Sequence, residues 1–200
     1  MPTKVDWYGD RFRRAVTLGS ERLLTALGIG FQSEVKSQLN KLASNRSKGG
    51  KPSPPGQPPA KMTGNLGRSI QIGAIKSTPT GMKIQVGAHA VYARIHEFGG
   101  TIKAKKGSLT IPIHPLAVKA SQQGVSARNI KGLSYVKTKR GGLLVKAKKK
   151  FMEVWYVLKK SVTMPKRPYF RPAMEVYNPK VQGIGERTFV RTVREVMRGA

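Results

Sequence analysis

Apolar residues recur at spacings of three, four or seven positions along residues 10–44, and this spacing predicts a long amphipathic helix. Asp10 can cap its start, and the helix is expected to stop near Asn45. Each glycine inside it costs about 1 kcal/mol relative to alanine, so the stretch Gly28-Ile-Gly30 is a candidate break. The apolar stripe consists of Phe12, Val16, Leu23, Leu27, Phe31, Val35, Leu39 and Leu42.

Alternating apolar and polar residues follow in the middle of the chain. Residues 67–76 and 82–88 alternate on either side of Thr78-Pro-Thr-Gly81, which predicts a β-hairpin. Further strands are expected at 109–113, 141–146 and 153–162, the last rich in β-branched and aromatic residues.

A second helix is expected to start near Tyr169, break around Asn178-Pro179 and resume as residues 181–198. Helices at the two ends, strands between them and no βαβ alternation indicate an α+β fold. We expect a mostly antiparallel sheet with the long N-terminal helix and the C-terminal helix packed on one face, plus extended loops or arms.

The length fits one domain spanning residues 1–200. Within it, residues 45–62 carry five prolines after a Gly-rich turn and are expected to form an extended arm or loop. Residues 114–150 are a further basic stretch, without acidic residues.

The chain has 38 Lys and Arg against 9 Asp and Glu, a net charge of +29. Both helical ends are mixed in sign, whereas no acidic residue lies between Glu34 and Glu97 or between Glu97 and Glu153. Such a field attracts polyanions: nucleic acid, an acidic protein ring or an anionic membrane. Membrane binding is the least favoured, because the basic residues lie in loops and strands rather than on one amphipathic helix.

Three lysine-rich loops are the candidate contacts with DNA or an acidic partner. They contain few interleaved aromatic residues, which suits phosphate contact and not base readout. The candidates are Lys103, Lys105, Lys106, Lys137, Lys139, Arg140, Lys146, Lys148, Lys149 and Lys150, and residues 137–142 have the composition of a basic hairpin tip.

The sequence offers few residues that could act in catalysis. The absence of cysteine excludes disulfides and thiolate metal sites and fits a reducing cytoplasm. His89, His96 and His114 lack the i, i+4 spacing of helical zinc sites, and carboxylates for acid–base pairs are scarce. Glu97 is expected to pair with a nearby cation such as Arg94. We therefore predict a protein that is not an enzyme and needs neither metal nor cofactor.

No secretory signal or membrane-spanning stretch is apparent.

Several short motifs occur in a fixed order over residues 50–175. They are the Pro-rich stretch Pro52–Pro59, Gly64-Asn-Leu-Gly-Arg-Ser-Ile70, a strand hairpin, Tyr92-Ala-Arg-Ile-His-Glu-Phe-Gly-Gly100, Leu109-Thr-Ile-Pro112 and Met164-Pro-Lys-Arg-Pro-Tyr-Phe-Arg-Pro-Ala173. In this order they resemble the small tail-completion or head–tail joining proteins of long-tailed bacteriophages, the virion-morphogenesis type. The insert at 114–150 departs from the shorter members.

The resemblance implies a structural virion protein of the phage neck or tail top, made in the host cytoplasm. It would form a ring of six or twelve copies. The ring would join the head-side connector, or head-completion protein, to the tail tube or its terminator. Its basic loops would face genome DNA or acidic neighbours. A tail terminator or minor tail protein, and a free sequence-independent nucleic-acid-binding protein, remain alternatives.

Aromatic and glycine residues are expected to serve the fold and the subunit interfaces. Trp155 and Tyr156 should lie on opposite faces of one strand, one in the core and one at an interface. The other candidates are Tyr92, Phe98, Gly99, Gly100, Tyr169 and Phe170.

Overall fold

The structure, a computed structural model, describes residues 8–41, 53–61, 63–139, 141–148 and 151–198. The chain is an α+β protein, as the hydrophobic pattern predicts. It divides into two compact units, where the pattern alone indicates one domain. We call residues 1–99 with 165–200 the helical unit and residues 100–164 the sheet unit. Among the helices that the structure describes, none is long and apolar enough to cross a membrane.

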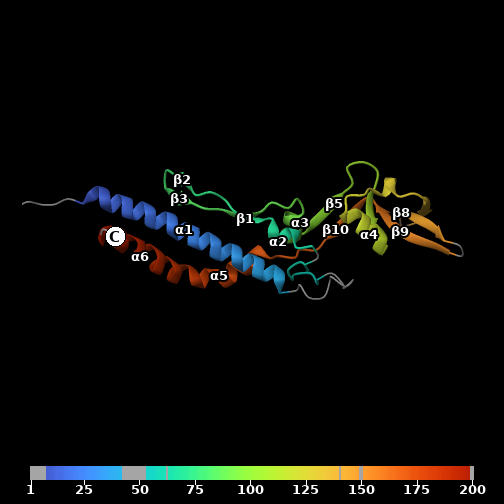
Figure 1. Cartoon of the computed structure of the whole chain (residues 1–200). Coiled ribbons are helices and arrows are strands. Elements are labelled where there is room, and N and C mark those ends of the chain that lie inside the picture. Colours follow the sequence, from blue (N-terminus) through green and yellow to red (C-terminus); the bar gives the residue numbers. More distant parts are fainter. Residues whose placement is uncertain (1–7, 42–52, 62, 140, 149–150, 199–200) are drawn as a thin grey trace, which may run out of the picture. The chain divides into compact units, whose positions relative to one another are not determined.

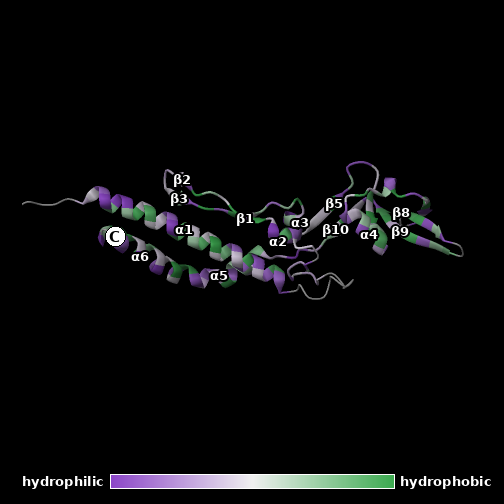
Figure 2. Ribbon diagram, in the orientation of Figure 1, coloured by the Kyte–Doolittle hydropathy of each residue, from purple (hydrophilic) through white to green (hydrophobic). Residues whose placement is uncertain are grey.

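The helical unit is built along one long helix, α1 (Gly9–Asn40). Two helices, α5 (Phe170–Gly185) and α6 (Arg191–Arg198), run beside α1 and are joined by the π-helical turn η2 (Glu186–Val190) (Figure 1). Hydrophobic positions recur along α1 and α6 between hydrophilic ones, and this pattern allows the helices to bury one face each (Figure 2). The smaller elements are α2 (Asn65–Arg68), β1 (Ile70–Ile72), β2 (Lys76–Thr78), β3 (Gly81–Lys83), β4 (Val86–Ala88) and α3 (Ala93–Phe98).

Helix α1 is continuous, so the break considered at Gly28-Ile-Gly30 does not occur. Its glycines lie where other elements approach the helix closely. A Cβ added at Gly19 would lie 3.0 Å from the Phe189 ring, and one at Gly30 would lie 2.9 Å from the Tyr177 ring. The packing that these glycines permit offsets their low helix propensity.

Gly30→Ala is expected to lower the free energy of unfolding by about 1–2 kcal/mol, because overpacking exceeds the gain in helix propensity. The Tyr177 hydroxyl, which donates to the Leu27 carbonyl at 3.1 Å, has to move. Denaturant unfolding followed by circular dichroism measures the change. Gly67→Ala is the control, because a Cβ at Gly67 would meet no atom within 4 Å. An equal effect of the two substitutions would contradict the packing role of Gly30.

The C-terminal helix also differs from its prediction. The break expected at Asn178-Pro179 is absent, since α5 runs through Pro179, and the irregular turn comes later, at η2. Pro179 lacks the N–H for an intrahelical hydrogen bond. Contacts with α1 hold the helix on both sides of it: Tyr177 bonds the Leu27 carbonyl, and Lys180 Nζ lies 3.4 Å from the Glu34 carboxylate.

The predicted hairpin is confirmed as a long antiparallel ribbon. Strand β1 pairs with β4, β2 pairs with β3, and the turn falls at Thr78–Gly81. The expected first strand begins later than residue 67, because α2 occupies its start. Ile70 of β1 is buried with Val35 and Leu39 of α1 and with Tyr169 and Ala173 at the start of α5.

The sheet unit holds a four-stranded antiparallel sheet in the order β6-β9-β8-β7 and a two-stranded ribbon, β5 with β10. The region expected as a basic insert, 114–150, therefore contributes regular elements where the structure describes it. The bounds are β5 (Gly100–Lys103), β6 (Leu109–Pro112), α4 (Pro115–Gln122), the 3-10 turn η1 (Ala127–Asn129), β7 (Leu133–Thr138), β8 (Gly141–Lys148), β9 (Phe151–Lys159) and β10 (Ser161–Met164).

Strands were predicted at 109–113 and 141–146, and both are confirmed as β6 and β8. The single strand predicted at 153–162 is instead two strands, because β9 pairs with β6 and β8 whereas β10 pairs with β5.

Trp155 and Tyr156 do not lie on opposite faces, so that prediction is wrong. The pairing between β8 and β9 shifts by one residue, from Leu144↔Tyr156 to Val145↔Val154, which leaves Trp155 as an extra residue in β9. Such a bulge breaks the two-residue alternation of a strand. Both aromatic side chains are buried in one core with Ala117 of α4, and their exposed fractions are 7% and 1%.

Candidate functional site

The motif Tyr92–Gly100 folds as the short helix α3, which ends at Gly99 and Gly100. Both glycines have positive φ, 70° and 138°, which glycine adopts without steric cost. Such a helix agrees with the sequence, where apolar Tyr92, Ile95 and Phe98 recur every three residues before the two glycines. The motif leaves two aromatic side chains on the surface, with Tyr92 exposed by 43% and Phe98 by 73%.

Glu97 of α3 caps helix α5. Its carboxylate accepts hydrogen bonds from the backbone N–H groups of Tyr169 at 2.8 Å, Phe170 at 3.0 Å and Arg171 at 3.1 Å. Because the first N–H groups of a helix have no intrahelical acceptor, a carboxylate here satisfies them and complements the helix dipole. The pairing expected with Arg94 is therefore replaced by a contact 72–74 residues away.

Further hydrogen bonds tie the motif Met164–Ala173 to the other motifs. The Arg167 N–H donates to the His96 carbonyl at 2.6 Å, and its Nε donates to the Ser53 carbonyl at 2.9 Å. The N–H of Gly56, in the Pro-rich stretch, donates to the Lys166 carbonyl at 2.9 Å. Three motifs that are far apart in the sequence thus form one junction, whose contacts are mostly to backbone atoms.

Tyr169 and Phe170 serve the core at this junction. Tyr169 is 1% exposed, and burial, followed by the charge of Glu97, raises the pKa of its hydroxyl above the ordinary value. Phe170 packs against Phe31, with ring centroids 6.0 Å apart. These two aromatic residues therefore stabilise the helical unit and leave Tyr92 and Phe98 as its exposed aromatic candidates.

The lysine candidates all lie in the sheet unit. Lys103 ends β5, Lys105 and Lys106 lie in the loop before β6, Lys137 is on β7, and Lys139 is in the turn between β7 and β8. These five side chains are exposed. Arg140, Lys149 and Lys150 lie outside the described residues.

Lys146 and Lys148 on β8 are held by neighbouring side chains. The Lys146 ammonium lies over the Trp155 ring, 4.9 Å from its centroid, and His114 stacks on the same residue at 4.7 Å. Lys148 forms an ion pair of 2.8 Å with Glu153, and His114 lies 3.7 Å from the same carboxylate. These contacts make Lys146 and Lys148 less available to an outside anion than the five exposed lysines.

Lys148 lowers the pKa of the Glu153 carboxyl below its ordinary value of 4.5 by its hydrogen bond and its charge. A lowered carboxyl pKa adds stability above the ordinary pKa, and this contribution disappears as the pH falls through the lowered value. Lys148→Gln should therefore raise the Glu153 pKa and reduce stability at neutral pH more than at pH 2–3. A carboxyl-carbon NMR titration checks the shift, with Lys137→Gln as a control. An unchanged Glu153 pKa would contradict the assignment.

Several further basic residues of the sheet unit lie outside the three lysine-rich loops. Apart from the adjacent Lys159 and Lys160 they are single residues in the sequence, and the fold places them in one unit with the clusters. They are Lys119, Arg128, Lys131, Lys159 and Lys160. Within the part of the chain that the structure describes, no three His, Cys, Asp or Glu side chains group as metal ligands would.

Comparison of the chain with protein-family models, with curated proteins and with solved structures finds no match.

Proposed function

We propose that this chain is a non-catalytic structural protein of a tailed-phage neck. In this proposal it assembles as a ring of six or twelve copies between the head-side connector and the tail tube, and its sheet unit binds the phosphates of genome DNA in the channel. The order of the motifs along residues 50–175 supports the place in the virion. The charge of the sheet unit supports the ligand.

One observation carries the DNA contact. Residues 100–164 hold fifteen lysines and arginines and a single acidic residue, Glu153, which is itself bound to Lys148. A field this one-sided attracts a polyanion from beyond contact distance. Thirteen of the fifteen are lysines, which bind phosphate as point charges and read no base edges. Binding of this kind lets DNA be retained after packaging and slide out at infection.

Apolar side chains beside α3 support contact between subunits. Val91 is 100% exposed and Phe98 is 73% exposed, with the half-exposed Tyr92 between them in the sequence. Large apolar groups that remain in water on a folded surface favour a partner that covers them, and aromatic residues are frequent anchors of such contacts. A neighbouring copy in a ring would bury this surface.

An early stop codon in this gene of the parent phage tests the proposal, with lysates viewed by negative-stain electron microscopy. DNA-filled heads and finished but separate tails are the expected result. Abnormally long or unfinished tails would instead assign the chain to the tail terminator. Intact infectious particles would exclude both virion roles and leave sequence-independent nucleic-acid binding as the function of the sheet unit.

A further inference from the structure

A second basic surface lies on the C-terminal helix, and it differs from the sheet unit in composition. Residues 8–22 and 186–198 together contain eight arginines and no lysine. Helix α6 packs on this part of α1: Arg11 Nε donates to the Val196 carbonyl at 3.0 Å, and Arg22 pairs with Glu195 at 3.1 Å. Acidic residues between these arginines make both helical ends mixed in sign, so the net charge of these stretches does not reveal the surface.

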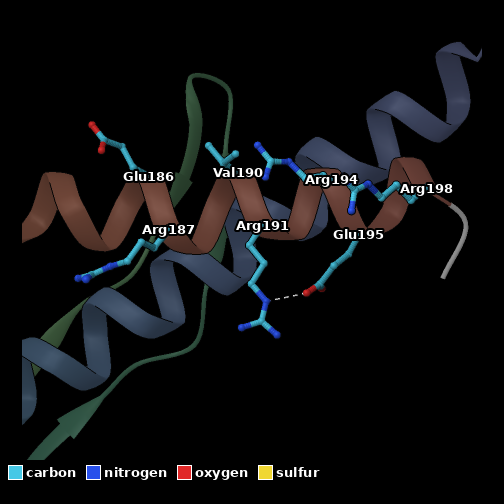
Figure 3. Close-up of a pocket in the computed structure, with 7 residues that line it drawn as sticks. All are labelled: Glu186, Arg187, Val190, Arg191, Arg194, Glu195 and Arg198. Atoms are coloured by element: carbon cyan, nitrogen blue, oxygen red, sulfur yellow. Dashed lines mark hydrogen bonds and ion pairs between the residues drawn. The ribbon is translucent and has the colours of Figure 1, made fainter.

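Four arginines define what we call the arginine face: Arg187, Arg191, Arg194 and Arg198. They are spaced by four, three and four residues, which brings residues to one side of a helix. With Glu186, Val190 and Glu195 they line a shallow concavity of about 460 Å³ (Figure 3). All four arginine side chains are exposed to solvent.

The arginine face has the composition of a protein–protein contact. Arginine and methionine are enriched in such contacts and lysine is depleted. Val190, exposed by 45%, adds apolar surface among the guanidinium groups. Arg191 is already oriented, because its Nε donates to Glu195 at 2.7 Å. Guanidinium groups bind carboxylates in a planar, bidentate geometry that an ammonium group does not reproduce.

We propose that the arginine face docks an acidic surface of another protein. Its own carboxylates argue against a nucleic acid as the ligand. Glu186 and Glu195 lie within the face, where they would repel a phosphate backbone at close range. A protein surface that presents carboxylates together with a few cations can complement both signs. The sheet unit has a single acidic residue, so it would repel a phosphate backbone much less.

A second copy of this chain does not supply the acidic surface. Five of the nine acidic residues are already engaged in described contacts within the chain: Glu34 with Lys180, Glu97 with the start of α5, Glu153 with Lys148, Glu175 with Arg171, and Glu195, in the face itself, with Arg22 and Arg191. Of the rest, Asp10, Glu21 and Glu186 lie within the arginine-bearing stretches 8–22 and 186–198, and Asp6 lies outside the described residues. The partner is therefore a different, acidic protein. This inference does not rest on the proposed function.

A fluorescent reporter at the face tests the proposal on the full chain. The sequence has no cysteine, so Val190→Cys places a single environment-sensitive dye in the arginine face, and Ser134→Cys places one on the exposed part of β7 in the sheet unit. The probes are a 20-residue peptide of glutamates with a lysine at every fifth position, which presents both signs, and a duplex DNA of 20 base pairs. The peptide should shift the dye at position 190 at lower concentration than the duplex does.

The decisive variant replaces all four arginines of the face by lysine. Charge is kept and helix propensity is nearly unchanged, so the helix should fold normally, and circular dichroism checks this. We expect the peptide concentration for half-saturation at position 190 to rise about tenfold, because bidentate pairing is lost. The response at position 134 should stay the same. Equal peptide binding by the lysine variant, no response at position 190, or tighter binding of the duplex there would each overturn the proposal.

Discussion

Replacing Glu97 by alanine should lower the free energy of unfolding by roughly 2–4 kcal/mol, since three backbone N–H groups at the start of α5 lose their acceptor. The carboxylate makes all three contacts at 2.8–3.1 Å and lies at the junction of the sequence motifs. The loss should appear first in the helical unit, because α5 packs on α1 through this end. Urea unfolding followed by circular dichroism at 222 nm measures it.

Two further variants separate capping from charge. Glu97→Gln keeps one acceptor oxygen and should lose roughly half as much stability as the alanine variant. Glu175→Ala removes an exposed carboxylate from α5 itself, where it pairs with the exposed Arg171, and should cost less than about 0.5 kcal/mol. If Glu97→Ala were no more damaging than Glu175→Ala, Glu97 would not stabilise the start of α5.

The elements of the helical unit were largely predictable, but the junction between its motifs was not. Local signals (apolar periodicity, turn residues and the proline-rich helix entry) predict α1, the hairpin and the start of α5, because each depends on residues close together in the sequence. The role of Glu97 depends on groups 72–74 residues away. The sequence does indicate that Glu97 is unusual, because it is a lone acidic residue in a long basic span. Local helical spacing, however, predicts Arg94 as its partner and not the start of α5.

Local rules failed where tertiary contacts override them. Glycines and a proline predicted breaks in two helices, yet close packing at Gly30 and anchoring on both sides of Pro179 keep the helices continuous. Strand alternation placed Trp155 and Tyr156 on opposite faces, yet one bulge puts both in the core. None of these contacts can be predicted from the spacing of nearby residues.

The two basic surfaces also show that prediction from local sequence spacing is incomplete. Lysine clusters such as 103–106 are visible in the sequence, because neighbouring residues share a loop. The fold places the scattered cations of residues 100–164 in one unit and the arginines of α6 in the other. The regular spacing of the arginines from 187 to 198 was the overlooked signal, hidden by the acidic residues between them.

Replacing Lys105, Lys106, Lys137 and Lys139 by glutamine should weaken binding of duplex DNA by roughly a hundredfold or more at 0.1 M salt. All four side chains are exposed. If each contacts one phosphate, their loss should reduce the slope of log K against log salt by about 3.6, since each contact contributes ~0.9. The loss should be the same for duplexes of different sequence, because lysines on phosphates read no bases. Fluorescence anisotropy between 50 and 300 mM salt measures the affinity and the slope.

A matched variant keeps the overall charge equal and moves the substitutions to the helical unit. Lys41, Lys76, Lys83 and Lys166 are also exposed, so replacing them by glutamine removes the same four charges. If the affinity for DNA depends on the net charge of the chain alone, the two variants should lose affinity equally. If the sheet unit forms the contact, the helical-unit variant should keep a slope within about one unit of the unaltered chain, because long-range attraction between exposed charges is screened beyond ~10 Å at 0.1 M salt. Equal losses would refute the assignment of the DNA contact to the sheet unit.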